Sequence, residues 1–234
     1  TITIGLLLRS ISLPAMTAPI LHQLLDQNFW LSPERVLFWE QEKTLIVSDL
    51  HFGKTGHFRK SGIAVPQSVY KEDLQRLFAQ ISFFKAEQLL IVGDLFHSIA
   101  NKEMDFFLKW RKDISQLPFL LIKGNHDILS SNWYQEASIE VKNEYKIHQF
   151  IFIHDPNESV TTTEDGSFIF SGHLHPGIIV RGLGKQSLRF PCFYFTEKQA
   201  ILPAFSHFSG LALIEPKKKD QVYAIVNQSI LQIQ

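Results

Sequence analysis

Short hydrophobic runs alternate with amphipathic segments over residues 44–175 of this chain. Five of these runs end in Asp, Asn or His, and they begin at Thr44, Leu89, Phe119, Phe150 and Phe168. Apolar runs of this length, bounded by polar residues, predict buried strands. Strands that alternate with helical segments are typical of an α/β fold with a parallel sheet. We therefore expect the polar endings to meet at the carboxyl edge of a sheet.

Two segments between the runs have the apolar spacing of helices. The first follows Pro66, which suits the first turn of a helix because its missing N–H costs nothing there. Its apolar positions are Val69, Leu74, Leu77, Phe78, Ile81 and Phe84. A second helix is expected from about Asn101, and its inner residues are Met104, Phe107, Leu108 and Ile114. The aromatic residues of both helices are interpreted as core.

The flanking regions predict further strands. Residues 20–40 carry short apolar stretches that indicate one or two strands. After His175 the sequence predicts short strands at 178–181, 188–195, 200–202, 211–215 and 222–226, which we interpret as a second sheet beside the first. Residues 20–234 are expected to form one domain. Residues 1–19 are interpreted as an N-terminal extension, because residues 16–19 resemble an ordinary protein start and residues 1–15 would precede it.

Composition narrows the classes of protein that fit. The 23 basic and 23 acidic residues cancel, so no global field attracts nucleic acid or a membrane, and any attraction of anions must be local. The single cysteine, Cys192, excludes an internal disulfide and a cysteine-based zinc cluster, and we interpret it as a small core residue. No apolar run approaches the length of a membrane span. We expect a cytoplasmic protein.

The polar endings together form a set of candidate metal ligands. Asp49 and Asp94 offer carboxylates, Asn125 offers an amide oxygen, and the imidazoles are those of His51, His154, His173 and His175. Asp49 and His51 alternate along the chain, so both face one site only if the chain turns after the strand. Imidazole and carboxylate ligands without thiolates suit manganese, our first expectation, and also iron or zinc. The ligands suffice for two divalent ions, and the two oxygens of Asp94 can bridge them.

This ligand set predicts chemistry on phosphate. Two divalent ions outweigh the two carboxylates and leave a positive site that favours a phosphate anion. His126 follows Asn125, which already points inward, so we expect His126 to be catalytic rather than a ligand. It would stabilise the developing charge or protonate the leaving oxygen. Asp127 is expected to orient its imidazole.

The motifs resemble those of the calcineurin-like metallophosphoesterases. The matching residues are Asp49-x-His51, Gly93-Asp94, Gly124-Asn125-His126-Asp127, His154 and Gly172-His173-x-His175. The resemblance implies a four-layer α/β/β/α sandwich and two metal ions that share Asp94. It implies one ion held by Asp49, His51, Asp94 and His175, and another held by Asp94, Asn125, His154 and His173.

A closer resemblance, over roughly residues 36–226, is to the DNA-ligase-associated phosphoesterases (PdeM). It is carried by residues 49–54, 58–62, 93–98, 172–176 and 191–195, among others. It implies a DNA repair nuclease that associates with a DNA ligase and a helicase. We expect an endonuclease, and an exonuclease stays open on the sequence. Lys54, Arg59 and His97 are then candidate substrate-binding residues. A solvated loop is the alternative for Lys54 and Arg59, and a structural hydrogen bond is the alternative for His97.

Two other functions stay open on the sequence. The neutral net charge and the lack of an aromatic stacking stripe suit a small-molecule phosphodiesterase or phosphatase, acting on a cyclic nucleotide or a nucleotide-linked substrate. A non-catalytic, metal-bound scaffold is the third candidate. The complete ligand set and the presence of His126 argue against it.

Overall fold

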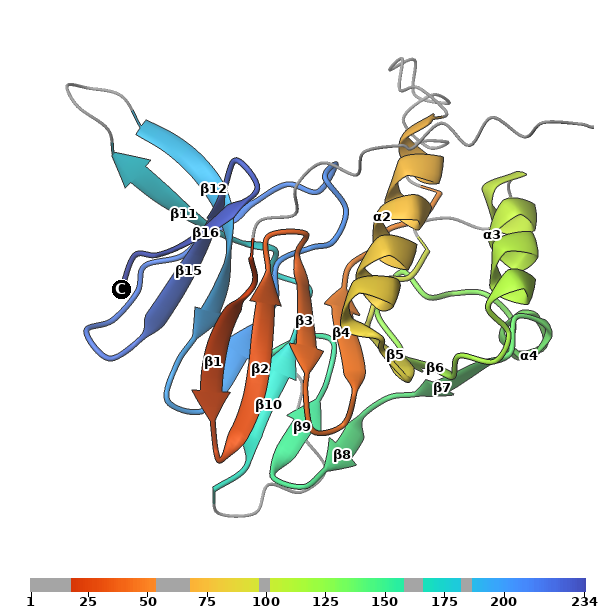
Figure 1. Ribbon diagram of the computed structural model, residues 1–234, viewed down its shortest axis with the longest axis horizontal. Coiled ribbons are helices and arrows are strands. Elements are labelled where there is room, and N and C mark those ends of the chain that lie inside the picture. Colours follow the sequence, from red (N-terminus) through yellow and green to blue (C-terminus); the bar gives the residue numbers. More distant parts are fainter. Residues whose placement is uncertain (1–17, 54–67, 97–101, 158–165, 182–186) are drawn as a thin grey trace, which may run out of the picture.

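A computed structural model of the chain describes residues 18–53, 68–96, 102–157, 166–181 and 187–234 (Figure 1). Residues 1–17 of the expected extension lie outside the described residues. So do Lys54, Arg59 and His97, the candidate substrate-binding residues. The first described strand begins at Ile20, where the domain was expected to start.

The first sheet contains seven described strands in their chain order. They are β1 (Ile20–Leu24), β2 (Gln27–Ser32), β3 (Val36–Trp39), β4 (Thr44–Ser48), β5 (Gln88–Val92), β6 (Phe119–Ile122) and β7 (Ile139–Lys142). Strands β1 to β4 pair antiparallel, whereas β4 to β7 pair parallel. The region 20–40 therefore forms three strands, not the one or two that its pattern predicted. The expected parallel arrangement of β4, β5 and β6 is confirmed.

Helices cover one face of this sheet (Figure 1). They are α2 (Ser68–Phe84), α3 (Lys102–Asp113) and the short α4 (Ser131–Glu136). Leu77 of α2 and Phe107 of α3 are fully buried in one hydrophobic cluster with Val47 and Ile91 of the sheet. The parallel strands need such crossover helices, because a hairpin turn cannot join strands that run in the same direction.

The second sheet contains nine described strands. They are β8 (Tyr145–Ile147), β9 (Phe150–Phe152), β10 (Phe168–Ser171), β11 (Pro176–Arg181), β12 (Ser187–Phe195), β13 (Gln199–Ile201), β14 (Ala212–Leu213), β15 (Gln221–Val226) and β16 (Ser229–Gln232). Strand β10 pairs parallel with β9 and with β13. A second core fills the space between the sheets, where Phe29 and Leu90 of the first sheet meet Phe150 and Phe170 of the second.

The expected sandwich of two sheets with helices is confirmed. In the part of the chain that the structure describes, all three helices cover the first sheet, so the second helical layer is not seen there. None of the described helices is long and apolar enough to cross a membrane. Cys192 is fully buried, and burial raises the pKa of its thiol to about 12. It is the core residue that its isolation in the sequence indicated.

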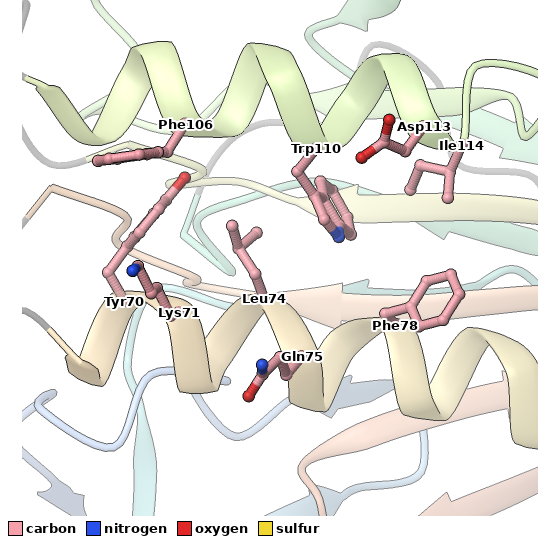
Figure 2. Close-up of a pocket in the computed structure, with 9 residues that line it drawn as sticks. All are labelled: Tyr70, Lys71, Leu74, Gln75, Phe78, Phe106, Trp110, Asp113 and Ile114. Atoms are coloured by element: carbon pink, nitrogen blue, oxygen red, sulfur yellow. The ribbon is translucent and has the colours of Figure 1, made fainter. Parts of the chain in front are cut away.

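Phe78 departs from the expected helix pattern. It was expected on the inner side of its helix, yet 46% of the side chain is exposed. It lies along a cavity of about 440 Å³ between α2 and α3, which is drawn in Figure 2. The apolar lining comes from Tyr70, Leu74, Phe78, Phe106, Trp110 and Ile114. No candidate metal ligand lines this cavity, so it is separate from the predicted site.

Candidate metal centre

The candidate ligands follow the carboxyl ends of strands from both sheets. Asp49 comes directly after β4, and Asp94 follows β5 by two residues. Backbone hydrogen bonds tie these two loops together, from Asp49 N–H to the Gly93 carbonyl (3.1 Å) and from His51 N–H to the Asp94 carbonyl (2.9 Å). The same strand ends that were predicted from hydrophobic runs therefore bring residues distant in sequence to one place.

Several of the ligands adopt left-handed backbone conformations. Their φ angles are +51° at Asp49, +48° at His51, +50° at Asp94, +64° at His173 and +48° at His175. Residues other than glycine seldom adopt positive φ, although Asp and His do so more often than most. Such strain gathers at functional sites, because the surrounding structure must hold it there. The chain thus turns after β4, which allows Asp49 and His51 to face the same site.

The first group of ligands is Asp49, His51 and His175. The Nε2 atoms of His51 and His175 lie 3.3 Å apart, and Nε2 of His175 lies 3.3 Å from Oδ1 of Asp49. This Oδ1 is buried and accepts no hydrogen bond from the described residues. A buried carboxylate oxygen without a donor is costly, whereas a cation at this point would satisfy it. The group therefore fits a divalent ion.

The second group is Asp94, His154 and His173. Nε2 of His154 lies 3.2 Å from Nδ1 of His173 and 3.1 Å from Oδ1 of Asn125. The other ring nitrogen of His154, Nδ1, lies 3.2 Å from the carbonyl oxygen of Val92. Because a carbonyl only accepts, Nδ1 is the nitrogen that keeps a proton, and Nε2 is the nitrogen that would bind a cation in exchange for its own proton. The structure thereby places Asn125 with the second group.

Asp94 faces both groups. Its Oδ2 lies 3.9 Å from Nε2 of His51, and its Oδ1 lies 3.5 Å from Nε2 of His154. Asp49 is fixed by two hydrogen bonds, because the Ser48 hydroxyl (2.7 Å) and the His173 backbone N–H (3.0 Å) both donate to its Oδ2. Asp94 thus lies between the two groups, where a ligand shared by two ions would have to lie.

Three glycines leave the room that these ligands occupy. A Cβ atom on Gly93 would lie 1.8 Å from Nδ1 of His154. A Cβ on Gly124 would lie 2.3 Å from Oδ1 of Asp94, and one on Gly172 would lie 2.5 Å from Oδ2 of Asp49. The glycines of the sequence motifs are thus explained by close approach of backbone to the ligands.

The electrostatics of the site favour positive charge. Burial alone would lower the pKa of His154, but the hydrogen bond with Asp94 and the charges of Asp49 and Asp94 raise it to about 9. Burial alone would raise the pKa of Asp94, yet His154, His51 and the His126 N–H lower it to about 2. The field that stabilises a proton on His154 would also stabilise a divalent cation, so the donor set fits two such ions.

His126 belongs to neither ligand group. Its backbone N–H donates to Oδ1 of Asp94 (2.9 Å), and its half-buried ring meets the His51 ring edge-on at 5.6 Å between centroids. It thus lies beside the first group with its ring apart from both sets of metal-binding atoms. This position suits the catalytic role predicted for His126, which stays a prediction.

Asp127 acts on the backbone of two loops. Its Oδ2 accepts from Gly124 N–H (2.8 Å), and its Oδ1 accepts from the N–H groups of Leu95 (3.0 Å) and Phe96 (3.4 Å). Burial raises its pKa to about 6, although these backbone bonds lower it. Both oxygens are engaged with backbone donors, and the expectation that Asp127 orients the His126 imidazole stays a prediction. Asp127 joins the loops that carry Asp94 and Asn125.

The sequence did not single out two further residues that contact the ligands. Ser48 ends a hydrophobic strand, and its hydroxyl donates to Asp49. Asp155 follows His154, and its Oδ2 lies 3.8 Å from Nε2 of His173. A polar residue at the buried end of an apolar run was the one available signal for Ser48. A pairing of Asp155 with His173 depends on the fold and leaves no mark in the sequence.

Two sheets with two groups of candidate metal ligands at their strand ends are the arrangement expected of a metallophosphoesterase. The family model for calcineurin-like phosphoesterases matches residues 42–174, which include the ligands from Asp49 to His173. The chain belongs to the calcineurin-like phosphoesterase family, as its motifs indicated. It is therefore a hydrolase of phosphoesters, and the family implies divalent metal ions.

Solved structures add two comparisons. The Pseudomonas putida nuclease MPE is 27% identical, with a TM-score of 0.77, and the alignment covers 92% of this chain and 100% of that chain. The Escherichia coli phosphoesterase Yfce is 13% identical, with a TM-score of 0.44, and the alignment covers 81% of this chain and 97% of that chain. No curated protein sequence matches this chain.

Proposed function

We propose that this chain is a two-metal phosphodiesterase that cleaves DNA, as an endonuclease linked to DNA repair. The observation that carries the proposal is the position of Asp94, whose two oxygens face His51 on one side and His154 on the other. Support for a nucleic-acid substrate comes from the likeness to a nuclease over the whole of that protein. The finer resemblance to the DNA-ligase-associated phosphoesterases is what favours DNA.

Each part of the site has a distinct task in this proposal. Two divalent cations, when bound, supply Lewis-acid stabilisation of the phosphoryl group and activate the attacking water. Asp94 and the histidines hold the ions in place, while Asp127 fixes the loops that carry Asp94 and Asn125. His126 donates a proton to the leaving oxygen or stabilises the developing charge from its place beside His51.

Manganese is our proposal for both ions, because the ligands are imidazole, carboxylate and amide oxygen without thiolate. Lys54 and Arg59 are proposed to contact phosphates that flank the scissile bond. His97 is proposed to lie near the substrate. These three residues are outside the described part of the chain. A DNA ligase and a helicase are the proposed partners, and a cytoplasmic location remains our expectation.

A second candidate function is hydrolysis of a small phosphodiester. The observation in its favour is the formal net charge of zero, because proteins that hold polynucleotides commonly present an excess of positive charge. The same metal site would serve a cyclic nucleotide or a nucleotide-linked substrate. The two functions differ only in the part of the substrate that flanks the reacting phosphate and in the residues that contact it.

An activity screen of the manganese-loaded protein decides between them. Single-stranded DNA, duplex DNA, RNA and a small chromogenic phosphodiester are compared, with the Asp94→Ala variant as control. We expect cleavage of DNA that is lost in the variant. Activity on the small diester alone would favour the second candidate. Equal activity of the wild type and the variant would contradict a two-metal site that depends on Asp94.

The contact with a polynucleotide has its own test. Lys54→Ala and Arg59→Ala are expected to weaken DNA cleavage at least tenfold more than cleavage of the small diester, because the small substrate has no flanking phosphates. Lys218→Ala, which removes an exposed lysine from a surface turn, is the matched control. Equal losses on both substrates would refute a track for nucleic acid at Lys54 and Arg59.

A further inference from the structure

The second ligand group uses its two histidines through different nitrogens. His154 presents Nε2, and His173 presents Nδ1, with 3.2 Å between these atoms. The remote nitrogen of His154 is already held, because Nδ1 lies 3.2 Å from the Val92 carbonyl oxygen. The remote nitrogen of His173 is Nε2, and it points away from the metal group. The partner of Nε2 therefore determines how firmly the ring is held with Nδ1 directed at the metal group.

Asp155 meets that remote nitrogen. Its Oδ2 lies 3.8 Å from Nε2 of His173, which is an electrostatic contact longer than a hydrogen bond. The side chains are 28% exposed for Asp155 and 34% for His173, so the contact lies at the mouth of the site. A carboxylate at this position favours the tautomer with the proton on Nε2 and the electron pair on Nδ1.

The Asp155 carboxylate is itself held in position. Its Oδ1 accepts two hydrogen bonds from Asn157, from the backbone N–H at 2.9 Å and from the side-chain amide at 3.0 Å. With Oδ1 engaged, Oδ2 is the oxygen that faces His173. A continuous set of contacts therefore runs from Asn157 through Asp155 to His173 and ends at the metal-binding atoms.

We infer that Asp155 is a positioning residue for the second metal ion, acting through the His173 ring, with Asn157 as its support. Carboxylates that face the remote nitrogen of a ligating histidine orient the ring and strengthen it as a ligand, and their loss typically weakens metal binding roughly 10–100-fold. The inference rests on the proposed two-metal site. It concerns binding of the ion, and hydrolysis follows from that binding.

The test is a manganese titration by calorimetry, with electron paramagnetic resonance to separate one bound ion from a coupled pair. Asp155→Asn keeps the shape of the side chain and removes its charge. We expect one of two Mn²⁺ ions to bind about tenfold or more weakly, with the other unchanged and the coupled signal lost at low manganese. Asn157→Ala should shift the same step by a smaller factor, because Asp155 stays in place.

Asp105→Asn, an exposed position on α3, is the matched control and should bind both ions as the wild type does. Asp155→Ala is measured beside Asp155→Asn. Wild-type affinity for both ions in the two Asp155 variants would overturn the inference, and so would loss of thermal stability without a change in either affinity. It would also be overturned if the wild type bound fewer than two ions. A wild type that binds two ions but cleaves no phosphodiester would overturn only the proposed function.

Discussion

The His154 ring packs directly on the backbone of Gly93, because a Cβ atom on Gly93 would lie 1.8 Å from Nδ1 of that ring. Gly93 also has a φ angle of +80°, which suits glycine and strains other residues. The ring in turn lies 3.2 Å from the carbonyl of Val92, the residue before Gly93. The backbone at the end of β5 therefore positions the imidazole of His154, which follows the end of β9.

Gly93→Ala is expected to displace the His154 ring and disable the second ligand group. We expect Mn²⁺ binding to weaken at least tenfold, and the free energy of unfolding to fall by about 1–3 kcal/mol through the clash and the strained φ. Calorimetric titration and denaturant unfolding measure the two effects. Gly210→Ala is the control, since a Cβ there meets nothing within 4 Å. Unchanged manganese affinity in Gly93→Ala would show that the ring is not held in this way.

Asp127→Asn tests the join between two loops. The amide would turn one buried acceptor into a donor that faces the N–H of Gly124 or Leu95, and within the described residues these two N–H groups donate only to Asp127. We expect the free energy of unfolding to fall by about 2–4 kcal/mol. Denaturant unfolding without added metal measures it, with the exposed Asp113→Asn as control. A change within about 0.5 kcal/mol would mean that these bonds do not support the fold.

The convergence of the candidate metal ligands could be predicted because their signal is local. A run such as 44–48 is apolar enough to be a buried strand, and the polar residue that ends it has to lie at the strand's carboxyl end. Asp49 and Asp94 could therefore be placed at one sheet edge before their distances were known. The parallel pairing of β4 with β5 then brings the two loops together. The rule that the carboxyl ends of parallel strands meet at one sheet edge thus predicted where most residues of the site lie.

The remaining features depend on packing between distant segments. Nothing near His173 says that it presents Nδ1, since that choice follows from the position of Asp155 after folding. The fold also brings backbone donors from another loop to Asp127, a contact that the sequence did not predict. Strand β7 was missed because it is only four residues long and alternates apolar with polar residues, of which Glu140 is exposed, whereas the predicted strands were continuous apolar runs. Its place at the edge of the first sheet explains this composition.

His22 predicts an acid-sensitive stability. Burial lowers its pKa to about 4, whereas the ordinary value is 6.5, so below pH 6.5 the unfolded chain binds a proton that the native state excludes. The stability from this group is present above pH 6.5 and is lost as pH falls toward 4, by roughly 1–3 kcal/mol. His22→Phe keeps the packing on Phe195. Denaturant unfolding above pH 6.5 and near pH 4 should show that this variant loses roughly 1–3 kcal/mol less stability than the wild type between the two pH values. The exposed His148→Gln should keep the full loss. Equal acid loss in His22→Phe and the wild type would refute the role of His22.

His126→Ala separates catalysis from metal binding. The backbone N–H of residue 126, not its ring, donates to Asp94, so alanine keeps that 2.9 Å bond. The ring belongs to neither ligand group. We therefore expect two bound Mn²⁺ ions and a melting temperature near that of the wild type, while phosphodiester turnover falls by about 10²–10⁴-fold, the usual worth of a general acid. The exposed His148→Ala, assayed beside it, should keep full turnover. Turnover that survives in His126→Ala would refute the catalytic role, and loss of a metal ion would make His126 a ligand.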